Sequence, residues 1–179
     1  MAELFEEMIS SEQIYDGKVV KLYKDTVRLP NGSTSVREIV RHPGAVCVVP
    51  VTDKGEIIMV RQFRYAFNKV FLEIPAGKLD FPGEDPRAAA LRELSEETGA
   101  EAASLEYLGL FCSTIAIFDE KIHMYLARGI KMGESHPDED EFLEIVTMPF
   151  HDAVEMVMDG KIEDGKTQAA ILKTWTKLR

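Results

Sequence analysis

The chain has 179 residues, enough for one domain of ordinary size with a small appendage. Its 21 Lys and Arg residues against 31 Asp and Glu residues give a net charge of −10, which argues against a general nucleic-acid-binding protein because such proteins need a basic surface. No apolar run approaches the ~20 residues of a membrane span, and the acidic N-terminus lacks the basic start of a secretion signal. We therefore expect a cytoplasmic protein that binds neither nucleic acid nor membrane.

The first half of the chain predicts mainly strands. Residues 18–41 predict two strands around the Pro-Asn-Gly-Ser turn at 30–33. The apolar run at 44–51 and the segment 56–61, separated by a turn at 52–55, predict a buried hairpin. A further strand is expected at 70–74. The two cysteines, Cys47 and Cys112, lie in apolar runs and are expected to be buried thiols rather than a disulfide or a zinc site.

The second half mixes helices and strands. A helix is expected to begin at Asp85 and Pro86, as cap and first residue, and to end at Gly99. Two more helices are expected at 149–159 and 164–178, and strands at 104–113, 121–127 and 141–147. This irregular alternation predicts an α/β protein in which a mixed sheet lies between helices. The acidic segment 132–140 is read either as a solvated connection or as a mobile flap beside a site.

Three carboxylates share one side of the helix that begins at Asp85. Glu93, Glu96 and Glu97 are spaced i, i+3 and i+4, within about a third of the helix circumference. Such like charges repel, so they form either a solvated acidic face or a site for a hard cation, since oxygen ligands suit Mg²⁺ or Mn²⁺. The neighbouring Arg92 can orient a carboxylate, and the loop at Gly77 allows a close backbone approach to an ion or a phosphate.

The stretch from Gly77 to Ala100 resembles the Nudix box, Gly-x5-Glu-x7-Arg-Glu-U-x-Glu-Glu-x-Gly-U with U aliphatic. The residues that match at the required spacing are Glu84, Arg92, Glu93, Leu94, Glu96, Glu97, Gly99 and Ala100. One departure is clear: six residues, rather than five, separate Gly77 from Glu84, which places a one-residue insertion at Phe81 or Pro82.

The flanking segments resemble the ADP-ribose pyrophosphatase and nucleoside diphosphate sugar hydrolase subfamily. The resemblance lies in residues 37–46, 60–64, 72–78, 138–142 and 166–167. It implies a Nudix fold, an α/β/α arrangement with an N-terminal antiparallel β extension. It also implies that residues 1–43 form a partly swapped dimerisation extension, that residues 44–179 form the hydrolase domain, and that the protein is a homodimer.

The resemblance also implies an activity and a metal site. The activity is Mg²⁺-dependent hydrolysis of the pyrophosphate bond of a nucleoside diphosphate sugar, ADP-ribose first, to a nucleoside monophosphate and a sugar phosphate, with Mn²⁺ as the alternative metal. The implied metal ligands are Glu93, Glu96, Glu97 and the Ala76 carbonyl. Arg92 is expected to orient the helix carboxylates.

The remaining roles fall outside the helix. Glu120 is the expected general base, with Glu139 and Glu141 as alternatives. The expected substrate-binding residues are Arg61, Arg64, Glu73 and Lys78, each of which could instead be an ordinary charge at a strand end or on the surface. An aromatic side chain is expected to stack on the base. The candidates are Phe5, Tyr15, Tyr23, Phe63 and Tyr65.

A second departure concerns the substrate. Enzymes of this subfamily that act on ADP-ribose usually carry a Ser-Pro-Gly-Phe-like turn after the box, whereas this chain has the bulkier, β-prone Thr-Ile-Ala-Ile at 114–117. GDP-mannose or other nucleotide sugars are therefore possible substrates. The alternatives are a Nudix enzyme that acts on nucleoside triphosphates, dinucleotides or RNA ends, a Nudix-fold binding module without hydrolysis, and a structural protein with an acidic surface helix.

Overall fold

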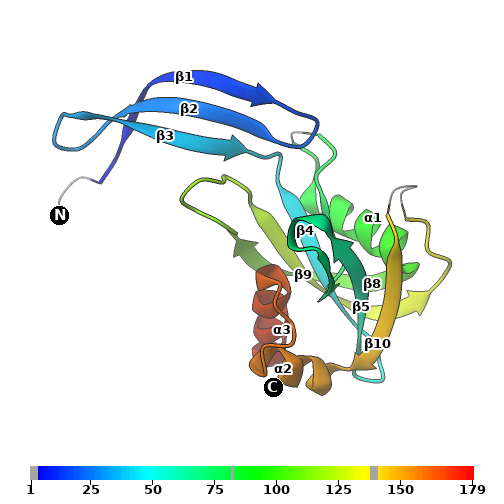
Figure 1. The fold of residues 1–179 in the computed structure, drawn as a ribbon. Helices are drawn as coiled ribbons and strands as arrows, with labels where there is room; N and C mark the ends of the chain where they lie inside the picture. The colour runs from blue at the N-terminus through cyan, green and yellow to red at the C-terminus, as the bar shows by residue number, and fades with distance from the viewer. Residues whose placement is uncertain (1–3, 82, 138–140) are drawn as a thin grey trace. The chain divides into compact units, whose positions relative to one another are not determined.

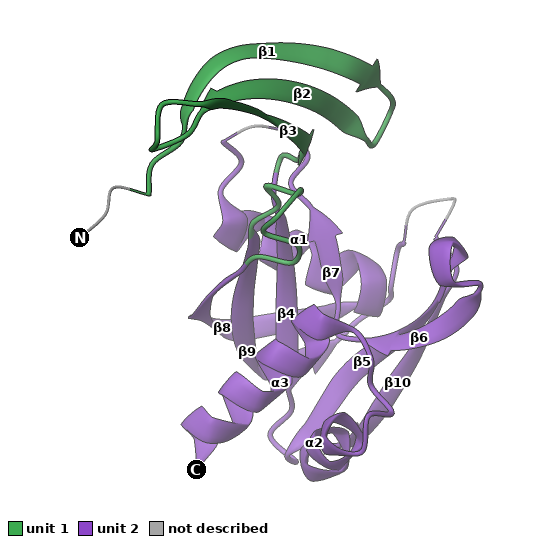
Figure 2. Ribbon diagram, turned by 60° about the vertical axis from the view of Figure 1, so that its left-hand side comes forward, with its two compact units in different colours: residues 1–43, 112–121 green, residues 44–111, 122–179 purple. Residues whose placement is uncertain are grey.

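The computed structural model describes residues 4–81, 83–137 and 141–179 (Figure 1). The chain forms two compact units (Figure 2). The smaller unit contains residues 1–43 and 112–121, and the larger unit contains residues 44–111 and 122–179. None of the helices in the described ranges is long and apolar enough to cross a membrane.

The smaller unit is built on an antiparallel sheet in the order β1-β2-β3, with β1 at Glu7–Asp16, β2 at Lys21–Arg28 and β3 at Thr34–Arg41. The sequence predicted β2 and β3 but missed β1. Every residue of β1 is exposed, so it carries no burial pattern to read, and backbone pairing to β2 defines it instead. Segment 112–121 joins this unit because Val40 and Phe118 form a bridge beside β3.

The larger unit is built on a mixed sheet. Its main path is β10-β5-β4-β9-β8, with β6 paired to β5 and β7 paired to β4. The strands are β4 (Ala45–Val51), β5 (Glu56–Arg64), β6 (Lys69–Glu73), β7 (Ala76–Lys78), β8 (Ala100–Phe111), β9 (Ile122–Met132) and β10 (Leu143–Pro149). β4 and β5 meet at Val51 and Ile57, whereas β4 pairs in parallel with β9 along its whole length. The predicted mixed sheet is therefore confirmed. The hairpin expected between β4 and β5 is much shorter than predicted, because only one residue pair joins the two strands.

Strand β4 lies between two helix layers. All its side chains are buried, and successive side chains point into two different cores, one on each face of the sheet. Cys47 and Val49 pack in the core that contains α2 (Phe150–Met158) and α3 (Gly165–Leu178). Val46 and Val48 pack against Leu94 of α1 (Pro86–Thr98) in the other core. Burying such a side chain contributes about 1.5–3 kcal/mol, so a strand apolar on both faces stabilises a helix layer on each side.

Helix α1 has the predicted ends. The Asp85 side chain accepts a hydrogen bond from the main-chain N–H of Arg87 at 3.1 Å, Pro86 is the first helical residue, and Gly99 ends the helix with φ +69°. The two cysteines differ, however. Cys47 is fully buried as expected, but Cys112 is exposed, because β8 ends at Phe111 and Cys112 begins the segment that leaves the sheet.

Candidate active site

One side of α1 carries a cluster of carboxylates around one guanidinium. Arg92 donates to Glu93 at 2.8 Å and to Glu96 at 3.1 Å, and it lies 3.4 Å from Glu84 and 3.3 Å from Asp80. Glu93, Asp80 and Glu96 raise the pKa of Arg92 against the opposing effect of burial, so the guanidinium stays charged. The predicted role of Arg92 in orienting the helix carboxylates therefore has a direct geometric basis.

Glu97 faces a different partner. Its side chain is buried, and its Oε2 accepts a hydrogen bond from the main-chain N–H of Ala76 at 3.2 Å. This bond connects α1 to the start of β7 and places the carboxylate beside the residue whose carbonyl was predicted to bind metal. Glu93 and Glu96 turn to Arg92 while Glu97 turns to Ala76. Accordingly, no three acidic, histidine or cysteine side chains of the described residues converge as a ready-made metal site.

Two of these carboxylates are buried without full charge compensation. Burial raises the pKa of Glu93 to about 7, although Arg92 opposes the shift. Burial raises the pKa of Glu97 to about 8, against the hydrogen bond from Ala76. The charge of Glu141 raises both pKa values further. Oxygen donors of this kind suit a hard divalent cation, whose charge offsets both burial and repulsion, so the residues present fit such an ion.

The turn before α1 answers the question of the inserted residue. Gly77 stays in the ladder, opposite Val46 of β4, and a Cβ there would lie 2.0 Å from the Glu93 carboxyl carbon. The extra residue, at position 81 or 82, comes after β7 in the sequence, and on either side of it Glu84 accepts a hydrogen bond from the N–H of Asp80 at 2.7 Å. Phe81 is exposed in this turn, and Pro82 lies outside the described residues.

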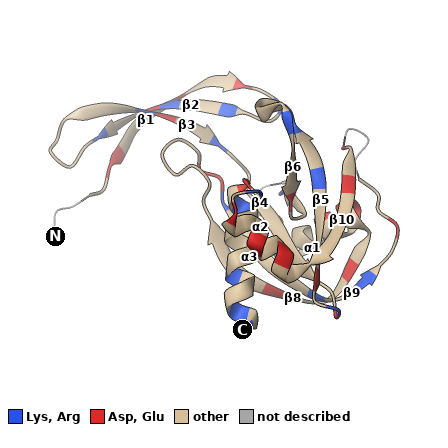
Figure 3. Ribbon diagram, turned by 60° about the horizontal axis from the view of Figure 1, so that its bottom comes forward, with Lys and Arg blue, Asp and Glu red and all other residues tan. Residues whose placement is uncertain are grey.

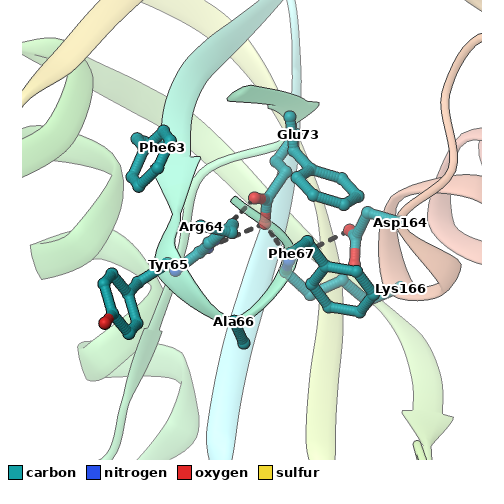
Figure 4. Close-up of a pocket in the computed structure, with 9 residues that line it drawn as sticks. Phe63, Arg64, Tyr65, Ala66, Phe67, Glu73, Asp164 and Lys166 are labelled. Carbon is teal, nitrogen blue, oxygen red and sulfur yellow. Dashed lines mark hydrogen bonds and ion pairs between the residues drawn. The ribbon is translucent and has the colours of Figure 1, made fainter. Parts of the chain in front are cut away.

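A pocket of about 380 Å³ lies at the junction of β5, β6 and the start of α3 (Figure 4). Its charged residues are Arg64, Glu73, Asp164 and Lys166. Its other lining residues are Phe63, Tyr65, Ala66, Phe67 and Phe71, mostly from the end of β5 and the short 3-10 helix η1 (Tyr65–Phe67). The pocket thus combines aromatic side chains with a charged set, an arrangement suited to a ligand with a planar base and polar groups.

Glu73 is the centre of the charged set. It is only 3% exposed, and it accepts two hydrogen bonds from the Arg64 fork at 2.7 and 2.8 Å and one from Lys166. Burial raises the pKa of Glu73, but the bonds and charges of Arg64 and Lys166 outweigh burial and hold it below its usual value. The alternative of a solvent-facing Glu73 is therefore wrong. The arrangement occupies both carboxylate oxygens and leaves part of the half-exposed Arg64 guanidinium to face a ligand.

The other two predicted substrate-binding residues lie elsewhere in this unit. Arg61 forms an exposed pair with Glu144 at 2.9 Å, where β5 runs beside β10 (Figure 3). Lys78 has an exposed side chain in β7, and its carbonyl lies 3.4 Å from Arg92. The structure therefore brings Arg64 and Glu73 together and leaves Arg61 and Lys78 outside the lining of this pocket.

The predicted base, Glu120, belongs to the smaller unit. Ser113 donates to its Oε2 at 2.8 Å, and the His42 Nδ1 lies 3.7 Å from its Oε1. Of the two alternatives, Glu141 lies within electrostatic range of Glu93 and Glu97, and Glu139 falls outside the described residues.

Several pocket residues were missed from the sequence. Lys166 lies in a segment that carries the family resemblance, but neither Lys166 nor Asp164 was assigned a role, because the start of a helix gives no signal of a contact with β6. Phe67 and Phe71, whose ring centroids lie 5.2 Å apart, gave no spacing signal because η1 interrupts the strand pattern. Of the five aromatic candidates for stacking, Phe63 and Tyr65 line the pocket. The other three, Phe5, Tyr15 and Tyr23, belong to the smaller unit.

A mixed sheet between helix layers, with a carboxylate helix behind a glycine-containing turn, defines a Nudix hydrolase. The NUDIX domain model matches residues 41–170, and the model of the nucleoside diphosphate sugar hydrolase N-terminal domain matches residues 6–40. The chain therefore belongs to the Nudix family, and it is an enzyme of the branch that carries this N-terminal domain.

Curated relatives agree with this assignment. A methanol dehydrogenase activator of Bacillus methanolicus is 48% identical over 96% of this chain and 94% of its own. An ADP-ribose pyrophosphatase of Bacillus subtilis is 47% identical over 96% of this chain and 93% of its own. A GDP-mannose pyrophosphatase of Yersinia pestis is 34% identical over 82% of this chain and 80% of its own. The crystal structure of an ADP compounds hydrolase has the same fold, with a TM-score of 0.85 at 23% identity, covering 98% of this chain and 96% of that one.

Proposed function

We propose that this enzyme hydrolyses the pyrophosphate bond of nucleoside diphosphate sugars in a Mg²⁺-dependent reaction, with ADP-ribose as the first substrate and AMP and ribose phosphate as products. The observation that carries the proposal is the short chain segment 73–77. It joins the charged pocket at Glu73 to the α1 carboxylates at Ala76 and Gly77 within one unit. A substrate with a sugar or base in the pocket can thus extend its phosphates toward the carboxylates.

The metal would be held by Glu93, Glu97 and Glu96, with the Ala76 carbonyl as a further oxygen donor. Support comes from the buried, under-compensated carboxylates and from the close approach of Gly77 to Glu93. When bound, the ion supplies charge cancellation on the phosphates and a more acidic water. Arg92 holds Glu93 and Glu96 in place. Mn²⁺ is the alternative ion, because its preference for oxygen ligands is similar.

The substrate would be held by Arg64, oriented by Glu73, with Tyr65 or Phe63 stacking on the base. Arg61 and Lys78 are proposed as phosphate contacts because both are cations in strands that lead to the site, β5 and β7. Mutation separates these roles: Arg64→Gln is expected to raise KM, whereas Arg61→Gln is expected to change KM less, because its guanidinium already pairs with Glu144.

Glu120 is proposed as the general base, with Glu141 and Glu139 as alternatives. The test is the pH profile of kcat for Glu120→Gln, Glu141→Gln and Glu139→Gln. The base is identified by the variant whose kcat falls by about 10²-fold or more and whose profile loses the fall in activity at low pH, with KM and folding preserved. Wild-type turnover of Glu120→Gln at pH 8 would remove Glu120 from the mechanism.

The substrate test is hydrolysis of ADP-ribose, GDP-mannose, ADP-glucose, UDP-glucose, NADH and ATP with and without Mg²⁺, with products separated by chromatography. ADP-ribose dominance with AMP as product supports the proposal in full. Comparable turnover of several nucleotide sugars would assign broader choice to segment 114–118, which lacks the expected proline. Release of pyrophosphate from ATP as the main reaction would overturn the proposal in favour of a triphosphate-directed enzyme.

We also propose that the enzyme is a cytoplasmic homodimer assembled through the smaller unit. The support is β1, whose residues are all exposed and include the apolar Met8, Ile9, Ile14 and Tyr15. Light scattering at micromolar concentration is expected to give about twice the mass of the 20.1 kDa chain. A monomer mass at that concentration would contradict this proposal.

A further inference from the structure

The start of helix α3 contacts the site from the layer opposite α1. Asp164 caps α3: one of its carboxylate oxygens accepts from the Thr167 N–H at 3.0 Å, from the Thr167 hydroxyl at 2.5 Å and from Lys166 at 2.9 Å. Lys166 also reaches Glu73, and the Thr167 hydroxyl accepts from the main-chain N–H of Ile74 at 3.1 Å. The start of α3 thus holds two consecutive residues: Glu73, the last residue of β6, and Ile74, which follows it.

Lys166 is charged in this position. Burial lowers its pKa, but the carboxylates of Asp164 and Glu73 outweigh burial and raise the pKa above its usual value. Its side chain is only 13% exposed, so it has little freedom to serve as a mobile surface charge. Because Lys166 and Arg64 bind the same Glu73 oxygen, the position of the carboxylate, and with it that of the Arg64 fork, depends on Lys166 (Figure 4).

Thr167 acts on the metal side of the same segment. It is fully buried, and its hydroxyl satisfies the N–H of Ile74, which is also buried. Ile74 lies two residues before Ala76, and the Ala76 N–H binds Glu97. A main chain held at Ile74 leaves little freedom at Ala76, because the intervening Pro75 has a fixed φ and its carbonyl accepts from Val48 at 2.9 Å.

We infer that the start of α3 is a positioning element for both halves of the active site: Lys166 sets the Glu73–Arg64 pair that receives substrate, and Thr167 sets the segment that presents Ala76 and Glu97. The inference rests on the proposed substrate role of Arg64 and the proposed metal role of Glu97. Neither Lys166 nor Thr167 is a catalytic residue, since each acts through another group.

The two arms predict different kinetic changes. Lys166→Met is expected to raise KM for ADP-ribose by about tenfold or more, the effect of losing a charge-assisted hydrogen bond, with kcat within about twofold. Lys166→Arg restores a charged donor and is expected to recover much of the loss. Thr167→Val frees the Ile74 N–H, so it is expected to lower kcat and leave KM within about twofold. It is also expected to weaken Mg²⁺ binding: Mg²⁺ raises Tm, and half of that rise should require a higher Mg²⁺ concentration than in the wild type.

Matched controls come from the same helix. Thr174 is also fully buried in α3, but its hydroxyl has no hydrogen-bond partner among the described residues, so Thr174→Val tests the substitution without the contact. Lys177 is half-exposed and pairs with Glu106, so Lys177→Met tests loss of a helix lysine away from the pocket. Both controls are expected to leave KM, kcat and the Mg²⁺ response within about twofold of the wild type.

The outcomes separate this inference from the proposed function. If Arg64→Gln raises KM but Lys166→Met lowers only Tm, Lys166 is a structural residue and the inference is overturned. If Arg64→Gln leaves KM unchanged as well, the proposed substrate pocket fails and the Lys166 arm fails with it. If Thr167→Val and Thr174→Val shift the Mg²⁺ response equally, the Thr167 arm is overturned. Lys166→Gln replaces Lys166→Met if the latter does not fold.

Discussion

Glu73 gives the sharpest test of the electrostatic reasoning, because its carboxylate is buried between two cations. Glu73→Gln keeps the shape of the side chain but removes the charge, leaving Lys166 in a nearly closed position with only Asp164 as an anion. Breaking a buried ion pair costs about 3–5 kcal/mol, and the lower end applies because Arg64 is 42% exposed and can be hydrated. For a chain of this size, about 3 kcal/mol corresponds to a fall in Tm of about 6–12 °C.

The pH dependence of this loss has a definite sign. The folded-state pKa of Glu73 lies below its usual value, so the folded protein holds the ionised form more strongly than the unfolded chain does. Its contribution to the free energy of unfolding is therefore complete above the unfolded pKa of about 4.5 and is lost as the pH falls through the folded pKa. The difference in Tm between wild type and Glu73→Gln should be constant between pH 6 and 8 and should shrink below pH 4.5.

The assay is thermal and urea unfolding of both proteins at one fixed protein concentration across this pH range, since association also shifts Tm. Glu106 offers a matched control, because it too pairs with two cations, Lys177 at 2.7 Å and Arg128 at 3.6 Å, but is 40% exposed. Glu106→Gln is expected to cost less than about 1 kcal/mol. Equal losses for the two variants, or a Glu73→Gln loss that does not shrink in acid, would refute the argument.

Three further predictions concern the rest of the site. Glu97→Gln should keep the hydrogen bond from Ala76 through its amide oxygen yet abolish the Mg²⁺-induced rise in Tm and lower kcat by about 10²-fold or more, as measured by thermal shift and product assay. Gly77→Ala places a Cβ 2.0 Å from the Glu93 carboxyl carbon and should lower kcat by about tenfold or more while Tm falls modestly; unchanged kcat would show that Glu93 is free to move. Tyr65→Ala, at a side chain 90% exposed, should raise KM for ADP-ribose without changing Tm, and an unchanged KM would exclude stacking on Tyr65.

The fold was largely readable because its signals are local. The Asp85–Pro86 start and the Gly99 end of α1 follow from capping chemistry, and the all-apolar β4 follows from burial on both faces. Strand β1 was missed because a fully exposed edge strand has no apolar alternation. Strand β7 was missed because three residues that follow Pro75 carry too little pattern to indicate a strand.

The site was readable only where its residues are close in sequence. The α1 carboxylates lie within one helix turn, so their grouping follows from helix geometry. The contact of Lys166 with Glu73 joins residues 93 positions apart, and no spacing rule predicts it without the fold. The same holds for Glu120, whose partners Ser113 and His42 became apparent only when segment 112–121 was seen to lie with β3.

The segment 73–77 explains why the inserted residue in the box is tolerated. Its residues contact both helix layers: Glu73 and the Ile74 N–H contact α3, whereas the Ala76 N–H and Gly77 contact α1. A shift of one residue here would move these groups away from their partners and break both sets of contacts. An extra residue in the turn 80–84 leaves the register of β7 on β4 unchanged, because the insertion lies after the last paired residue. In this chain the insertion therefore leaves the close approach of Gly77 to Glu93 unchanged.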